Sequence, residues 1–433
     1  MQRNWFLGDL LTQLFQRRTH LFGGKDDTRS MIALCDALLA EEGEVSGYRL
    51  ASTFLERYQE ADDAAKLEFF QYLNAELDVD AGTLVELAKS YGQDKSKDVF
   101  KALSRAAEPR RQELLRRLNQ PAGATQDLVA MRVDLLRFQK EHPDLGRTDF
   151  DFQHLLQSWF NLGFLVLKQI NWDTPARILD KVIAYEAVHE ISDLDDLRKR
   201  LYPPDRRCFA FFHPSMPDEP LIFVEVALTS EVPGSIDELL VENRSPLAAE
   251  DAKVAVFYSI SNCQTGLLGI SFGNLLIKQV VAELSLDLPN LNQFVTLSPI
   301  PKLNTWLTTK TDDAELGPAA RQVLAGQSTS ETVAQLAARY LISAKRKDGF
   351  PFDPVARFHL GNGAEVQAVH ANADLSENGQ NQSSGAMVNY HYDLTKTERH
   401  HEDYVRNATV SATKDVLALA RSDLSLQTKD KIA

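Results

Sequence analysis

The first 165 residues keep one hydrophobic pattern throughout. Apolar residues recur every three or four positions, as on one face of an α-helix, and no β-branched run interrupts them. Glycines and prolines break the pattern at intervals and indicate short connections. We therefore expect an all-helical domain over residues 1–165, packed as a bundle or as antiparallel hairpins. Its helices are expected over 31–39, 50–58, 67–77, 84–91, 99–103, 114–118 and 128–138.

The pattern changes after this region, and a second domain is expected over residues 166–433. Two helices are predicted at the junction, over 155–167 and 175–189, and short apolar runs rich in β-branched and aromatic residues follow. Helical segments alternate with these runs, which indicates a mixed α/β sheet. Strands are expected over 208–212, 221–227, 254–259, 294–297, 356–360, 366–369 and 388–392, with helices over 235–241, 274–284, 332–341 and 405–419 and a polar loop over 377–385.

Residues 254–306 form the most informative stretch of the second domain. An apolar strand pattern opens into a polar, glycine-bearing turn over 261–273, and a helical pattern follows. A second strand, 294–297, breaks at Ser298-Pro299-Ile300-Pro301, because proline cannot continue the interior of a sheet. Ser298 is therefore expected at a strand end, where functional side chains commonly lie.

Three glycines of the turn, Gly266, Gly269 and Gly273, precede the helix. Glycine lets backbone amides approach a ligand closely, and the start of a helix favours an anion. Neither the Gly-Lys-Ser/Thr ending of a P-loop nor the acidic residue of a dinucleotide fold is present at the required spacing. The turn is thus either an anion-binding loop or a structural turn, and the glycines alone do not separate the two.

Composition narrows the class of protein. The chain has 433 residues, of which 44% are hydrophobic and 25% charged, as in a globular protein of two domains. No stretch approaches the ~18 apolar residues of a membrane span, so no membrane partner is expected. The net charge of −14 argues against nucleic-acid binding, which needs a basic surface. One phosphorylated ligand is still compatible with this charge, because backbone amides and local cations such as Lys278 and Lys302 suffice to hold it.

The three cysteines, Cys35, Cys208 and Cys263, are far apart and lack metal-ligand spacing, so we expect no metal site and a reducing, cytoplasmic environment. The first 18 residues are interpreted as an amphipathic helix rather than a transit peptide, because Asp9 interrupts them and serine is absent. The final Lys-Ile-Ala is not a peroxisomal signal.

Five segments carry a resemblance to known proteins: 161–201, 206–229, 254–306, 358–366 and 388–394. In this order they resemble the malonyl-CoA decarboxylase family. The turn 264–273 is also similar to the pyrophosphate loop of the Gcn5-related N-acetyltransferase superfamily, whose backbone amides hold the diphosphate of coenzyme A. The resemblance implies an acetyltransferase-like fold for the second domain. It further implies cofactor-free conversion of malonyl-CoA to acetyl-CoA and carbon dioxide, and a homo-oligomer, dimer or tetramer, formed through the helical domain.

The resemblance also assigns residues. Ser298 in Leu-Ser-Pro-Ile-Pro matches the family's catalytic serine, which accepts a proton and hydrogen-bonds near the malonyl carboxylate, and His359 in Phe-His-Leu-Gly-Asn-Gly matches the histidine that donates a proton. Without the resemblance these would be a turn serine and a core histidine. Asn362 is first a turn residue and second a substrate contact. Some relatives carry an acidic residue at position 271, where this chain has serine. The coenzyme A contacts carry over onto Leu268, Gly269, Ile270, Ser271, Phe272, Gly273 and Asn274.

The chemistry needs few groups. Loss of carbon dioxide from a malonyl thioester leaves an enolate, so the enzyme must align the carboxylate, offer hydrogen-bond donors to the developing oxyanion and protonate the α-carbon. The thioester itself accepts the electrons. A hydrolase is disfavoured because Ser298 lacks a Gly-x-Ser-x-Gly elbow. Two alternatives stay open: an acyl-CoA N-acyltransferase using the same loop, and a non-catalytic acyl-CoA sensor.

Overall fold

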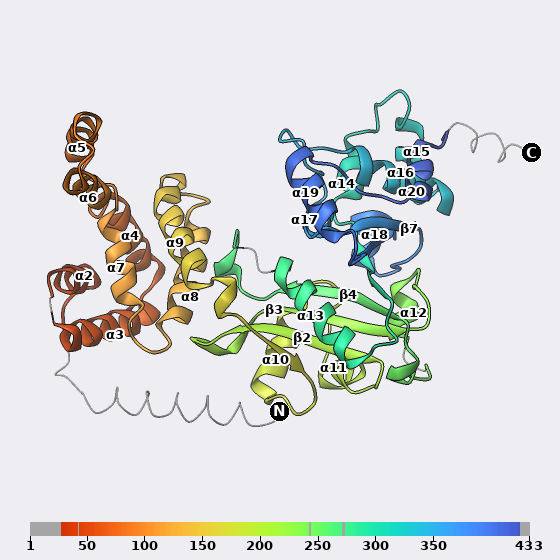
Figure 1. Cartoon of the computed structure of the whole chain (residues 1–433), viewed down its shortest axis with the longest axis horizontal. Coiled ribbons are helices and arrows are strands. Elements are labelled where there is room, and N and C mark those ends of the chain that lie inside the picture. The colour runs from red at the N-terminus through yellow and green to blue at the C-terminus, as the bar shows by residue number, and fades with distance from the viewer. Residues whose placement is uncertain (1–26, 42, 242–243, 271–272, 425–433) are drawn as a thin grey trace, which may run out of the picture. The chain divides into compact units, whose positions relative to one another are not determined.

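The computed structural model describes residues 27–41, 43–241, 244–270 and 273–424 (Figure 1). The predicted N-terminal amphipathic helix and the last nine residues lie outside the described residues. The chain divides into two compact units. The first holds the described residues up to Val166 together with Phe212–Glu219 and Gln264–Ile270, and the second holds the remainder.

The first unit is helical, as predicted. Three of its helices begin at a side chain that caps free amides: Ser30, Asp62 and Asp80 each accept a hydrogen bond from the first turn. A cluster of aromatic side chains fills the core, with the Phe54 and Phe69 rings 5.0 Å apart and the Phe69 and Phe70 rings 5.4 Å apart. The helices are α2 (Met31–Ala40), α3 (Glu44–Glu60), α4 (Asp63–Ala75), α5 (Ala81–Gln93), α6 (Lys97–Ala106), α7 (Arg110–Leu118), α8 (Ala124–Phe138) and α9 (Gly146–Trp159).

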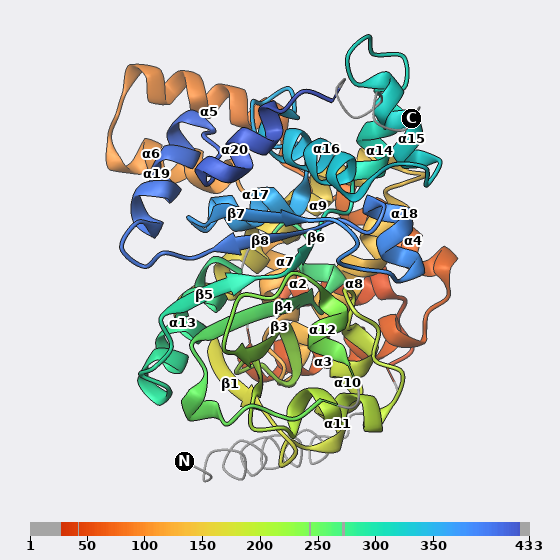
Figure 2. The same ribbon diagram turned by 90° about the vertical axis from the view of Figure 1, so that its right-hand side faces the viewer.

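The second unit is built on a mixed sheet. Among the described residues the sheet has eight strands. Seven follow the order β1-β2-β3-β4-β5-β8-β6, and the eighth, β7, pairs with the other edge of β8 (Figure 2). The predicted strand is β4. The glycine turn and α13 (Gly273–Asp287) follow it and lead to β5, which runs parallel to β4. The strands are β1 (Val166–Ile170), β2 (Arg206–His213), β3 (Met216–Thr229), β4 (Val254–Asn262), β5 (Gln293–Thr296), β6 (Ser298–Pro299), β7 (Glu365–His370) and β8 (Met387–His391).

The predicted order of fold types is confirmed: a helical region precedes a mixed α/β sheet. Within the second unit, α16 and α20 lie side by side. None of the helices in the described part of the chain has the length and apolar character needed to cross a membrane. The remaining helices are α10 (Ala176–Tyr185), α11 (Leu194–Leu201), α12 (Ile236–Leu240), α14 (Leu303–Thr308), α15 (Gly317–Leu324), α16 (Ser330–Ser343), α17 (Pro354–Gly361), α18 (Glu377–Ser383), α19 (Thr397–Asn407) and α20 (Lys414–Arg421).

Four local predictions were wrong. The helix expected over 155–167 ends at Trp159, and the following apolar residues form β1. Residues 356–360 form α17 rather than a strand, and the expected loop over 377–385 contains α18. The final helix over 405–419 is two helices, because Ala408 adopts a left-handed conformation with φ 50° and ends α19.

Candidate active site

Ser298 lies where the chain passes from β5 to the short strand β6. β5 ends at Thr296, and after Leu297 the chain pairs with β8 again as β6, with Ser298 opposite Val388. The prolines at 299 and 301 then end the strand, as the sequence indicated. Ser298 is only 5% exposed, so its hydroxyl lies inside the protein rather than on an open turn.

His359 lies in the last turn of α17. Asp353 caps this helix by accepting hydrogen bonds from the amides of Val355 and Ala356, and Pro354 occupies the first turn, where a missing amide costs nothing. The sequence-based expectation of a strand end for His359 was therefore wrong. His401 in α19 contacts the carbonyl of Gly361 at 2.7 Å, which fastens the end of the helix.

The two residues meet although 61 positions separate them. Ser298 Oγ lies 3.2 Å from His359 Nε2, and Ser298 donates to Thr296 Oγ1 at 2.8 Å. On the other side of the ring, His359 Nδ1 lies 2.8 Å from the Tyr392 hydroxyl. Because Ser298 uses its proton toward Thr296, its lone pairs face His359. This arrangement assigns the imidazole proton to Nε2 and makes Tyr392 the donor to Nδ1.

Burial determines the charge states of His359 and Tyr392. His359 is 3% exposed, and burial lowers the pKa of its imidazole from 6.5 to about 3. Burial also raises the pKa of the Tyr392 phenol well above its ordinary value. Both groups are consequently neutral at neutral pH. The Tyr390 ring stacks on the imidazole at 4.6 Å between centroids and fixes its plane.

Asn362 completes the surroundings of His359. It is the C-cap of α17, and its backbone amide donates to the carbonyls of Phe358 and His359. Its side chain is 2% exposed and lies beside Tyr392. The amide interacts with the Tyr392 phenol and lowers its pKa against the larger effect of burial, but neither amide atom makes a well-aligned hydrogen bond among the described residues. A buried amide without well-aligned partners is costly, so it is a group available to a ligand.

The glycine turn belongs to the first compact unit up to Ile270. At the end of the 3-10 turn over Thr265–Leu267, the amide of Leu268 donates to the carbonyl of Thr265. The amide of Ile270 donates to the carbonyl of Leu267. Gly269 adopts φ 86°, a left-handed conformation that suits glycine. Leu268 is 65% exposed. Ser271 and Phe272 lie outside the described residues, and α13 begins at Gly273 and Asn274.

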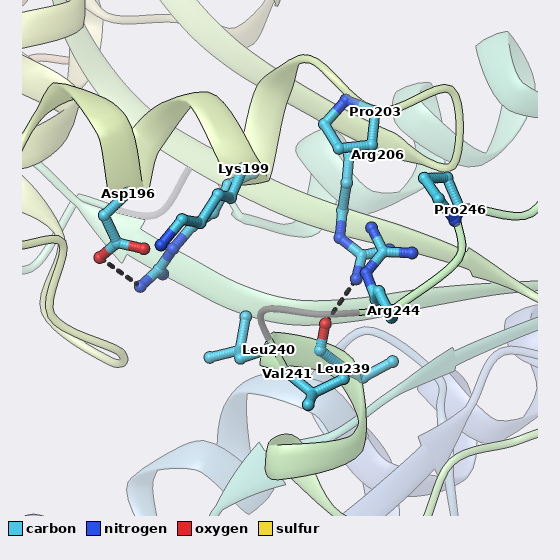
Figure 3. A pocket seen from close by; sticks show the side chains of 10 residues that line it. Asp196, Lys199, Pro203, Arg206, Leu239, Leu240, Val241, Arg244 and Pro246 are labelled. Carbon is cyan, nitrogen blue, oxygen red and sulfur yellow. Dashed lines mark hydrogen bonds and ion pairs between the residues drawn. The ribbon is translucent and has the colours of Figure 1, made fainter.

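A cavity of about 170 Å³ lies away from Ser298 and His359 in the fold, where α11 and α12 meet the start of β2 (Figure 3). Its basic lining is already paired: Arg200 with Glu225, and Arg244 with Asp205, while Arg206 donates to the carbonyl of Leu239. We therefore interpret it as a structural ion-pair network rather than an anion site.

Tyr392 was missed as a partner of His359. The predicted strand 388–392 contained the signal, because alternate residues of a strand share a face and Tyr390 and Tyr392 are two apart. The contact with His359 was not predictable, because His359 lies on α17, which the hydrophobic pattern predicted as a strand. His391, which lies between these two tyrosines in the chain, contacts Glu365 at 3.3 Å instead of His359.

Comparison with known proteins identifies the family of the chain. Two family models match the chain: the malonyl-CoA decarboxylase N-terminal domain over residues 77–160 and the malonyl-CoA decarboxylase C-terminal domain over residues 163–430. The mitochondrial malonyl-CoA decarboxylase of Anser anser anser is 35% identical over 350 residues, covering 72% of this chain and 69% of the relative. That of Rattus norvegicus is 33% identical over 351 residues, covering 72% and 71%.

Solved structures extend the similarity over the whole fold. The crystal structure of malonyl-CoA decarboxylase from Rhodopseudomonas palustris matches with a TM-score of 0.84 and 49% identity, covering 89% of this chain and 98% of that chain. The protein of that name from Agrobacterium vitis matches with a TM-score of 0.86 and 46% identity, covering 91% and 100%. Since the family models span both regions and relatives of this identity share the fold, the chain belongs to the malonyl-CoA decarboxylase family.

Proposed function

We propose that this protein converts malonyl-CoA to acetyl-CoA and carbon dioxide, with Ser298 and His359 as its catalytic pair. The observation that carries the proposal is the buried contact between Ser298 Oγ and His359 Nε2. Family membership supports the reaction, and the contact supports the residues. No separate cofactor is needed, because the thioester accepts the electron pair.

The reaction breaks the bond between the carboxylate carbon and the α-carbon. The electron pair passes into the thioester as an enolate, carbon dioxide leaves, and a proton adds to the α-carbon. His359 is neutral in the ligand-free protein. An entering malonyl carboxylate favours the protonated imidazole, because a nearby opposite charge stabilises the charged form. The imidazole takes this proton from solvent, and His359 then has a proton to give. Ser298 accepts a hydrogen bond from the imidazole and holds it in place, and it reaches the carboxylate by turning its own proton away from Thr296.

The proposal assigns coenzyme A to residues 268–274. The left-handed Gly269 and the start of α13 at Gly273 support an anion site, because both place backbone amides where no side chain intervenes. The amides of Leu268 and Ile270 donate within the turn, so Gly269 and Gly273 are the proposed diphosphate contacts. We retain residues 1–165 and 166–433 as the proposed domains, and the cytoplasm as the proposed location.

Self-association is proposed through the hairpin of α5 and α6 (Figure 1). Neither helix contains a buried residue, although both are amphipathic. Phe100 is 53% exposed, and its ring contacts that of Tyr91. An exposed apolar stripe of this kind favours contact with another protein surface, and we propose a second copy of the chain as that surface. Phe100→Glu is expected to lower the mass measured by analytical ultracentrifugation, whereas Lys101→Glu on the same helix is the control.

The deciding experiment mixes the purified protein with malonyl-CoA in deuterated water, without an amine. Acetyl-CoA carrying one deuterium is expected. Unchanged malonyl-CoA would overturn the decarboxylase, and an amine screen would then separate an acyl-CoA N-acyltransferase from a sensor that binds malonyl-CoA and leaves it intact.

A further inference from the structure

A buried arginine of the helical region holds the glycine turn. Arg132 of α8 donates through Nη1 to the carbonyl of Gly266 at 2.9 Å and to the carbonyl of Leu268 at 2.8 Å. These residues are more than 130 positions apart but belong to the same compact unit. Arg132 is 2% exposed, so its contacts are shielded from water and are stronger than surface contacts would be.

The guanidinium is itself fixed from the other side. Arg132 Nε lies 2.7 Å from one carboxylate oxygen of Asp149 in α9, and Nη2 lies 3.3 Å from the other. A buried charge requires such a partner, and the remaining donors require acceptors. The two carbonyls of the turn provide those acceptors. The position of the turn is therefore tied to the α8–α9 pair by a rigid, forked contact.

The glycines of the turn fit the same interpretation. A Cβ on Gly266 would overlap the carbonyl of Val129 in α8, and one on Gly269 would overlap the side-chain amide of Gln153 in α9. Gly266 is thus required for close packing on α8. The sequence-based interpretation, in which both glycines serve an anion, did not include this role.

Peptide geometry links Arg132 to the ligand side of the turn. The carbonyl of one residue and the amide of the next point in opposite directions across a planar trans peptide. Because the Leu268 carbonyl points at Arg132, the Gly269 amide points away from it. We propose that Arg132 is a positioning residue for coenzyme A: it orients the Gly269 amide toward the diphosphate. This inference rests on the proposed function of the turn.

The test compares two substrates. Arg132→Lys keeps the charge but offers a single nitrogen. It therefore loses the arrangement in which Nε and Nη2 hold Asp149 while Nη1 donates to two carbonyls. We expect KM for malonyl-CoA to rise about tenfold, the loss of one or two hydrogen bonds, with kcat within twofold. The malonyl thioester of N-acetylcysteamine lacks the diphosphate, so its kcat/KM is expected to stay unchanged. Asp149→Asn, which loosens Arg132 without removing it, is expected to act in the same direction more weakly, and it replaces Arg132→Lys if that variant does not fold.

Arg111 offers a matched control. It is also buried in the helical region and pairs with an aspartate of α9, Asp151, at 2.5 Å, but its recorded partners do not include the turn. Arg111→Lys is expected to lower the melting temperature without changing KM. Equal losses on both substrates in Arg132→Lys, or an unchanged KM for malonyl-CoA, would overturn the inference. Calorimetry with coenzyme A alone gives a readout without turnover: weaker binding to Arg132→Lys is expected even if the protein does not decarboxylate malonyl-CoA, and equal binding would overturn the inference.

Discussion

Ser298 Oγ and His359 Nε2 lie 3.2 Å apart inside the second compact unit, on β6 and α17. If this pair performs the proton transfer, Ser298→Ala and His359→Ala each lower kcat at least ~100-fold, the usual effect of losing a proton-transfer group. The measurement is steady-state release of acetyl-CoA, with circular dichroism to verify folding.

The double variant sharpens this prediction. Two residues that act as one unit give losses that do not add, so Ser298→Ala with His359→Ala is expected to be about as slow as the slower single variant. Thr308→Ala on α14 is a control, because its hydroxyl donates only to the helix carbonyl of Asn304. Retention of activity in both single variants would contradict the assignment.

Tyr392 provides the second prediction. Its hydroxyl donates to His359 Nδ1 and holds the proton on Nε2. Tyr392→Phe removes one hydrogen bond and is expected to lower kcat about tenfold, equivalent to the ~1.4 kcal/mol of such a bond. Tyr258→Phe is a matched control, because the buried Tyr258 hydroxyl has no partner among the described residues. Equal activity of the two variants would remove Tyr392 from the site.

The low pKa of His359 makes a prediction about stability. The unfolded chain binds a proton at this histidine below its ordinary pKa of 6.5, whereas the folded chain does not until about 3. The free energy of unfolding therefore rises with pH across this window by up to about 1.4 kcal/mol per pH unit, and the contribution is complete above pH 6.5.

His359→Phe isolates that contribution. Urea unfolding between pH 4.5 and 8 should give a shallower pH dependence for the variant than for the unchanged protein, by about one proton below pH 6.5. Other buried histidines, such as His213, whose pKa burial also lowers, remain in both proteins and cancel. Parallel curves would mean that the pKa of His359 in the folded protein is the same as in the unfolded chain.

Much of the fold followed from periodicity. The helices of the first unit and the strand, turn and helix around α13 were predicted because each buries one face, and burial imposes a period on the sequence. Short elements were predicted less well. In α17, a capping aspartate and a proline mark a helix start, yet the apolar run after them has the length of a strand, and tertiary packing decides between the two.

The site was predictable only in part. Ser298 and His359 came from resemblance, and no local pattern states that residues 61 positions apart share a hydrogen bond. The role of Arg132 was not predicted, for a related reason. An arginine in an amphipathic helix ordinarily faces water, and only the fold shows that this one is buried and contacts the glycine turn. Polar contacts between residues far apart in the chain impose no periodic pattern on the sequence, so the sequence alone does not predict them.

Asn362 yields the last prediction, because its buried side-chain amide makes no well-aligned hydrogen bond among the described residues. An unsatisfied buried amide costs about 1–3 kcal/mol. Asn362→Leu keeps the branched shape of four side-chain heavy atoms and removes that cost, so the variant is expected to be at least as stable as the unchanged protein in urea unfolding. If the amide binds the malonyl group, the same variant loses activity, with kcat/KM for malonyl-CoA falling at least tenfold. The malonyl thioester of N-acetylcysteamine should suffer the same loss, since it keeps the malonyl group. Gained stability with full activity would make Asn362 a turn residue only, and lost stability would show that its amide has a structural partner.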